Sequence, residues 1–77
     1  MTCYVNLPHI LVRISLARDR YHEAEKELIQ IAGPGAAGPM RQGSWSELTW
    51  GFVRREDADL FKVNAENIPG VLAVQMT

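Results

Sequence analysis

The stretch from Trp45 to Arg54 most constrains the fold, because it holds both tryptophans and alternates in the manner of a β-strand. The alternation defines two faces, with Leu48, Trp50 and Phe52 on one and Trp45, Thr49 and Val53 on the other. A strand that is apolar mainly on one face packs helices against that face and leaves the other open or half covered. The stretch therefore predicts a sheet with a single helical layer.

The rest of the chain supplies the other strands and the helices of such a fold. Alternation predicts a strand at 9–16, three- and four-residue spacing predicts helices at 18–32 and 55–68, and a final strand follows at 71–76. Ser15 or Asp19 is expected to cap the first helix, and Gly33 to end it. Whether residues 1–8 form a strand stays open, since Pro8 would restrict them to an edge.

The order of these elements is β-α-(β)-β-α-β, which predicts an α+β fold. We expect a ferredoxin-like two-layer sandwich, in which an antiparallel sheet of three or four strands carries two helices on one face. The chain should form a single domain over residues 1–77, with a flexible loop at 33–43. A short strand at 39–42 within that loop is an alternative.

The junction Ile68-Pro69-Gly70-Val71-Leu72-Ala73-Val74 resembles the P-G-V-x-x-V segment of small ferredoxin-like regulatory and metal-chaperone domains. The resemblance covers these seven residues and implies the same fold. The metal chaperones carry a paired-cysteine loop, which this chain lacks, so their copper-carrying function does not transfer.

No set of residues with a catalytic pattern stands out. Gly33 to Gly38 matches G-x-G-x-x-G, but the segment follows a helix instead of a strand, and no helix pattern comes after it. His22 lacks the second histidine that a zinc helix places four residues later, since position 26 is lysine. Cys3 has no identifiable partner. We expect no enzyme activity, no cofactor and no metal.

Charge and hydropathy narrow the choice of partners and location. The net charge is −1, and the eight basic residues are scattered among nine acids, so direct nucleic-acid binding is disfavoured. No apolar run approaches the roughly 18 residues of a membrane span. A lone cysteine suits a reducing compartment. These features predict a cytoplasmic protein that does not enter membranes.

Two surfaces are candidates for protein interaction. The first is an acidic wall on the outer sides of the two helices, and the second is the open face of the sheet. The residues expected to carry them are Glu23, Glu27, Glu56, Asp57 and Asp59 for the wall, and Leu11, Trp45 and Val53 for the open face. Solubility alone would also explain the acids, and Trp45 could instead cover the core.

The leading hypothesis is a non-enzymatic module that inhibits or regulates a larger protein or protein complex, such as one with a basic surface, by covering part of it. This profile is similar to that of small phage-encoded inhibitors, including anti-CRISPR proteins. One alternative is a dimer joined through the open sheet face that binds or transforms a small molecule between sheet and helices, with His9, Arg13 or Tyr4 as polar anchors. Another is weak nucleic-acid binding through Arg41, Arg54 and Arg55.

Overall fold

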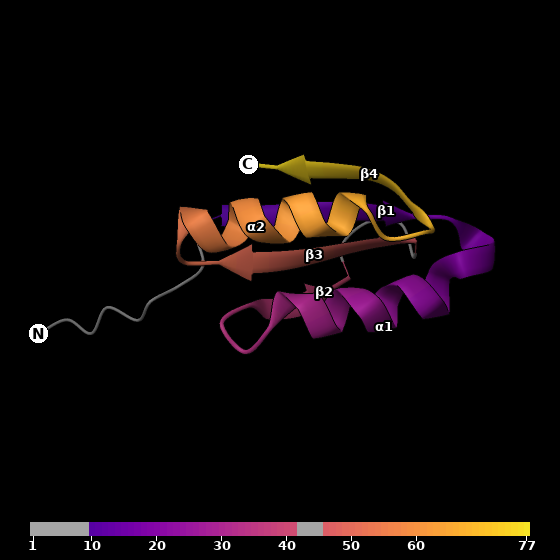
Figure 1. Cartoon of the computed structure of the whole chain (residues 1–77), viewed down its shortest axis with the longest axis horizontal. Helices are drawn as coiled ribbons and strands as arrows, with labels where there is room; N and C mark the ends of the chain where they lie inside the picture. The colour runs from indigo at the N-terminus through magenta and orange to yellow at the C-terminus, as the bar shows by residue number, and fades with distance from the viewer. Residues whose placement is uncertain (1–9, 42–45) are drawn as a thin grey trace, which may run out of the picture.

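The computed structural model describes residues 10–41 and 46–77, which form a four-stranded antiparallel sheet and two α-helices (Figure 1). The elements in chain order are β1 (Ile10–Leu16), the 3₁₀ turn η1 (Arg18–Arg20), α1 (Tyr21–Ala32), β2 (Ala37–Met40), β3 (Glu47–Phe52), α2 (Arg55–Glu66) and β4 (Val71–Met76). The predicted small α+β architecture is confirmed.

The strands lie in the order β2-β3-β1-β4, so β1 and β3 occupy the centre of the sheet. In the β1–β3 register Val12 lies opposite Trp50, and Arg13 lies opposite Thr49. Strand β4 pairs with the other edge of β1, and the pairing extends past its end. The Thr77 amide donates to the Leu11 carbonyl at 3.0 Å, and the Leu11 amide donates to Thr77 Oγ1 at 3.0 Å.

One side of the sheet faces the helices and carries the core. Val12, Ile14 and Leu48 are fully buried there. The helices contribute residues at the predicted spacing: Tyr21, Ala24 and Leu28 from α1, and Ala58, Phe61 and Ala65 from α2, with Ile68 just after it. The Phe61 ring lies 5.3 Å from Trp50 and 5.1 Å from Phe52, measured between ring centroids. The predicted inner face of the 45–54 strand is therefore core.

The predicted loop at 33–43 contains strand β2, two residues earlier than the alternative strand at 39–42. Ala37 pairs with Gly51 and Met40 with Thr49, and the register shifts between them. Gly38 permits this pairing, since its φ is +130° and a Cβ would come within 2.8 Å of a β3 carbonyl oxygen. The sequence predicted a loop here because glycine and proline are more common in turns and loops than in strands.

The start of the first helix also differs from the prediction. Residues 18–20 form the turn η1, and α1 begins at Tyr21. Neither Ser15 nor Asp19 caps it, since no side chain makes a cap hydrogen bond at η1 or α1. A backbone bond from the Arg20 amide to the Ala17 carbonyl, 3.1 Å long, forms this turn instead. The question about residues 1–8 lies outside the described residues.

Within residues 10–41 and 46–77, no helix is long and apolar enough to cross a membrane.

Candidate interaction surfaces and a pocket

The five acidic candidates are all exposed on the helices. Glu56, Asp57 and Asp59 lie in the first turns of α2, where the helix dipole favours negative charge, and Glu23 and Glu27 lie on α1. Two further acids on the same helices form ion pairs. Glu25 Oε2 is 3.3 Å from Arg41 Nη2, and Glu66 Oε2 is 3.5 Å from Lys62 Nζ.

Apolar side chains interrupt the wall, a feature that the charge pattern alone did not predict. Leu60 is 62% exposed and Val63 is 54% exposed. With Ala58, Phe61 and Ala65 turned to the core, a helical repeat of 100° per residue places Leu60 and Val63 on the opposite side, in line with Glu56. The sequence contains a signal for this exposure, because Leu60 and Val63 fall outside the three- and four-residue spacing of Ala58, Phe61 and Ala65.

Arg41 links the end of β2 to α1. Its Nη1 donates to the Tyr21 hydroxyl, its Nη2 contacts Glu25, and its guanidinium carbon lies 5.6 Å from the centroid of the Tyr21 ring. This residue was one of three arginines in the nucleic-acid alternative. Its side chain therefore makes contacts within the fold, whereas Arg54 and Arg55 are exposed at the start of α2.

Two of the three candidates on the open sheet face lie in the described part of the chain. Leu11 is half-buried, and Val53 is exposed just beyond the end of β3. Trp45 lies outside the described residues. The side chains that share the central strands of this face are mostly polar or small: Arg13, Ser15, Glu47, Thr49 and Gly51.

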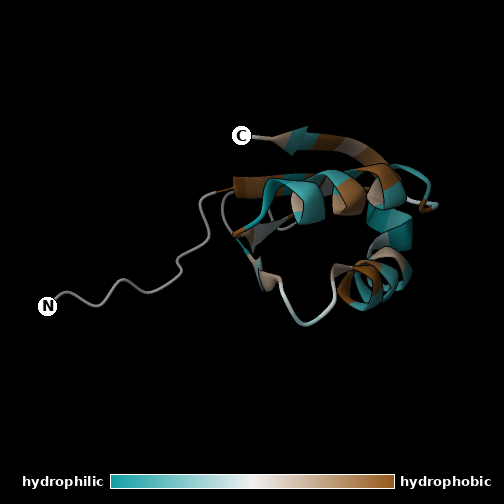
Figure 2. Ribbon diagram, turned by 60° about the vertical axis from the view of Figure 1, so that its left-hand side comes forward, coloured by the Kyte–Doolittle hydropathy of each residue, from teal (hydrophilic) through white to brown (hydrophobic). Residues whose placement is uncertain are grey.

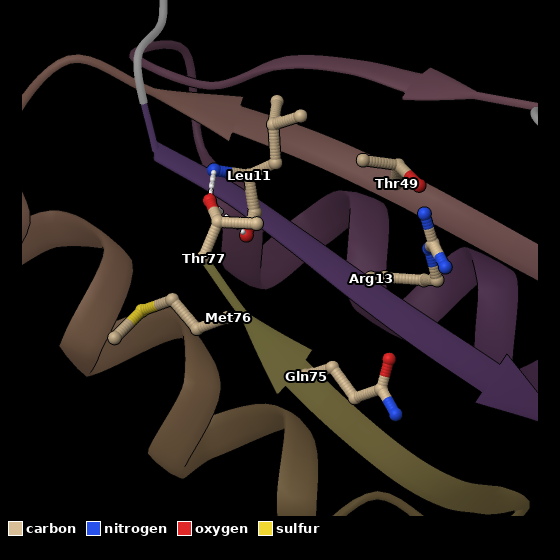
Figure 3. A pocket seen from close by; sticks show the side chains of 6 residues that line it. All are labelled: Leu11, Arg13, Thr49, Gln75, Met76 and Thr77. Carbon is tan, nitrogen blue, oxygen red and sulfur yellow. Dashed lines mark hydrogen bonds between the residues drawn. The ribbon is translucent and has the colours of Figure 1, made fainter.

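A pocket of about 340 Å³ opens on this same face (Figure 3). It is lined by Leu11, Arg13, Thr49, Gln75, Met76 and Thr77, which come from β1, β3 and the end of β4. The small-molecule alternative placed its cavity between sheet and helices, and of its three anchors Arg13 lines this pocket. Tyr4 and His9 lie outside the described residues.

Thr49 is the most unusual residue of the pocket. It occupies the outer face of the sheet, yet it is only 1% exposed, and its hydroxyl has no hydrogen-bond partner among the residues that the structure describes. Its cross-strand neighbours are Arg13 on β1 and Met40 on β2. Buried hydroxyls are nearly always paired, because an unpaired one costs free energy of desolvation. The sequence showed Thr49 only as an outward position of a strand.

Among the residues that the structure describes, no three His, Cys, Asp or Glu side chains lie close enough together to hold a metal ion. Comparison of the chain with protein-family models, curated proteins and solved structures found no match.

Proposed function

We propose that the chain is a ferredoxin-like domain that binds a larger protein and regulates it by covering part of its surface. The order β-α-β-β-α-β and the strand order β2-β3-β1-β4 support the fold assignment, since both belong to that arrangement. The role is binding without catalysis, in the cytoplasm.

The exposed pair Leu60 and Val63 carries the functional proposal. Both side chains lie on the outer side of α2, where a helix that covers one face of a sheet normally presents polar residues to water. Single exposed apolar residues are common on protein surfaces. Two of them on the same side of one helix can form the apolar centre of a protein interface. Figure 2 shows brown, hydrophobic stretches within the otherwise teal ribbon of α2.

Charge around this pair defines the partner. Glu56, Asp57 and Asp59 are exposed beside it, and no ion pair of theirs is seen within the described part of the chain. An apolar centre with an acidic margin fits a partner surface that has an apolar patch bordered by lysine or arginine. A protein that binds nucleic acid has such basic surfaces.

The open sheet face is the less favoured surface for self-association. Among the described residues its central positions other than Leu11 are polar or small, so these residues would contribute little apolar area to a dimer formed there. Light scattering after size exclusion measures the oligomeric state directly. A stable dimer that persists in the Leu60→Asp/Val63→Asp variant would indicate that the chain associates through the open sheet face.

The proposal is tested by quantitative affinity capture from the source cells with wild-type protein and the Leu60→Asp/Val63→Asp variant. We expect a defined protein to be recovered by wild type and lost from the variant, since one buried charge at the centre of an interface removes most of its affinity. Charge reversal of Glu56, Asp57 and Asp59 to lysine should reduce the same capture, with the largest effect at low salt.

Leu72→Asp is the matched control, because Leu72 is an equally exposed apolar residue, but on β4. Glu23→Lys/Glu27→Lys asks whether the acids of α1 also contribute. Equal recovery by wild type and the Leu60→Asp/Val63→Asp variant, with folding confirmed by circular dichroism, would refute the assignment of α2 as the binding surface.

A further inference from the structure

We propose that the pocket on the outer face of the sheet is a binding site for a small organic carboxylate, held by Arg13 and Thr49. This inference is independent of the protein-binding proposal, because the pocket lies on the face of the sheet opposite the helices.

Two hydrogen-bond donors that have no acceptor in the described part of the chain lie next to each other in this pocket. Arg13 and Thr49 are direct cross-strand partners, and Figure 3 shows the guanidinium beside the hydroxyl. No hydrogen bond joins them, since the Thr49 hydroxyl has no partner, and within residues 10–41 and 46–77 no ion pair of Arg13 is found. A ligand oxygen that accepts from both groups would satisfy them together.

The charge of the site indicates a monoanion. Arg13 is the one charged side chain among the six that line the pocket, and none of the other five side chains carries a carboxylate. A planar guanidinium matches the two oxygens of a carboxylate, and a hydrogen bond that carries charge is shorter and stronger than a neutral one. Thr49 is only 1% exposed, and a hydrogen bond in such a setting of low dielectric constant is electrostatically stronger than it is in water.

The other lining residues describe the rest of the ligand. Leu11 offers an apolar side chain, and Gln75 adds an amide that can donate and accept. The Thr77 hydroxyl is already bonded to the Leu11 backbone and holds the end of β4 in place. A volume of about 340 Å³ is at the lower end of the range of ligand pockets, which suits a carboxylate with a short apolar or aromatic body.

The test is a titration of the full chain, uniformly labelled with ¹⁵N, followed by two-dimensional amide NMR. The probes are benzoate, its neutral isostere benzamide, and inorganic phosphate. We expect benzoate to shift the amides of Leu11, Arg13, Thr49 and Gln75 with a millimolar Kd, and benzamide to bind at least tenfold more weakly. Phosphate should also bind at least tenfold more weakly than benzoate, because it has no apolar body to place against Leu11.

Variants separate a ligand role from a structural one. Arg13→Gln should abolish the benzoate response, whereas Arg55→Gln, which removes the same charge from α2, should leave it unchanged. Thr49→Val should weaken benzoate about tenfold while its melting temperature does not fall. A purely structural role for Thr49 would instead lower the melting temperature and leave the affinity intact.

The proposal is overturned if benzoate up to about 20 mM, well above the expected millimolar Kd, produces no saturable shifts at the pocket. It is also overturned if benzamide binds as tightly as benzoate, or if phosphate binds more tightly than benzoate. Shifts that map to α1 and α2 instead of the pocket would equally overturn it.

Discussion

The carbonyl of Gly70 accepts a hydrogen bond from the amide of Ala17 at 2.7 Å, which joins the turn before β4 to the turn after β1. The contact brings the glycine so close to η1 that a Cβ at position 70 would lie 2.6 Å from the Cβ of Arg20. With φ at +99°, position 70 also requires a backbone conformation that side chains disfavour.

Gly70→Ala should therefore lower the free energy of unfolding by about 2 kcal/mol, which combines backbone strain with the clash against Arg20. Urea denaturation followed by tryptophan fluorescence measures it. Gly35→Ala is the matched control, because a Cβ at position 35 would have no atom within 4 Å and the φ of Gly35 is not positive. The stability of this control should change by less than about 0.5 kcal/mol. Equal stability of the two variants would contradict the structure of this turn.

Thr49→Val should raise the free energy of unfolding by about 1 kcal/mol. The substitution keeps the shape of the side chain and removes a buried hydroxyl that has no partner. Thr77→Val provides the contrast, since it loses the bonds between the Thr77 hydroxyl and the Leu11 backbone and should cost about 0.5–1 kcal/mol. Urea denaturation of both variants measures the difference. A loss of stability in Thr49→Val would show that its hydroxyl is satisfied in solution.

Phe61→Leu should cost about 1–2 kcal/mol, because it removes ring contacts with Trp50 and Phe52 from the centre of the core. In a domain of this size, where total stability is only about 3–5 kcal/mol, that is a large fraction. The adjacent Leu60→Ala should change stability by less than about 0.5 kcal/mol, since Leu60 is exposed. Similar costs for the two in chemical denaturation would mean that the helix is rotated from the orientation described.

Tyr21→Phe and Arg41→Gln should not be additive. The Arg41 guanidinium donates to the Tyr21 hydroxyl, so each change removes the same bond, and the double-mutant cycle should give a coupling of about 0.5–1 kcal/mol. Thermal unfolding of the four proteins measures this coupling. A value near zero would show that Arg41 does not hold the end of β2 against α1 in solution.

The sequence was sufficient for the elements whose periodicity comes from burial. The alternation at Ile10, Val12 and Ile14 and the helical stripe at Ala58, Phe61 and Ala65 predicted the core correctly, since each pattern records which face meets the other layer. Strand β2 was predicted only as an alternative that begins two residues too late, because its pairing depends on the backbone freedom of Gly38 and not on hydrophobic alternation.

The sequence predicted less of the candidate sites than of the fold. The exposure of Glu56 and Asp59 follows from their places on the helix and was predicted. The pocket was not predicted, because Arg13, Thr49 and Gln75 come from three different strands. Only the order of the strands in the sheet brings these residues together. The cross-strand neighbours of Thr49, Arg13 and Met40, are equally set by the sheet order, which a single strand does not reveal.

The place of β1 in the middle of the sheet has a consequence for biosynthesis. Of the described strands it leaves the ribosome first, yet one of its edges stays unpaired until β4, the last of them, has been translated. The chain therefore carries an open strand edge until β4 pairs with β1, a state that favours association with other chains. The edge of β1 is no longer open once β4 has paired with it and Thr77 has formed its hydrogen bonds with Leu11.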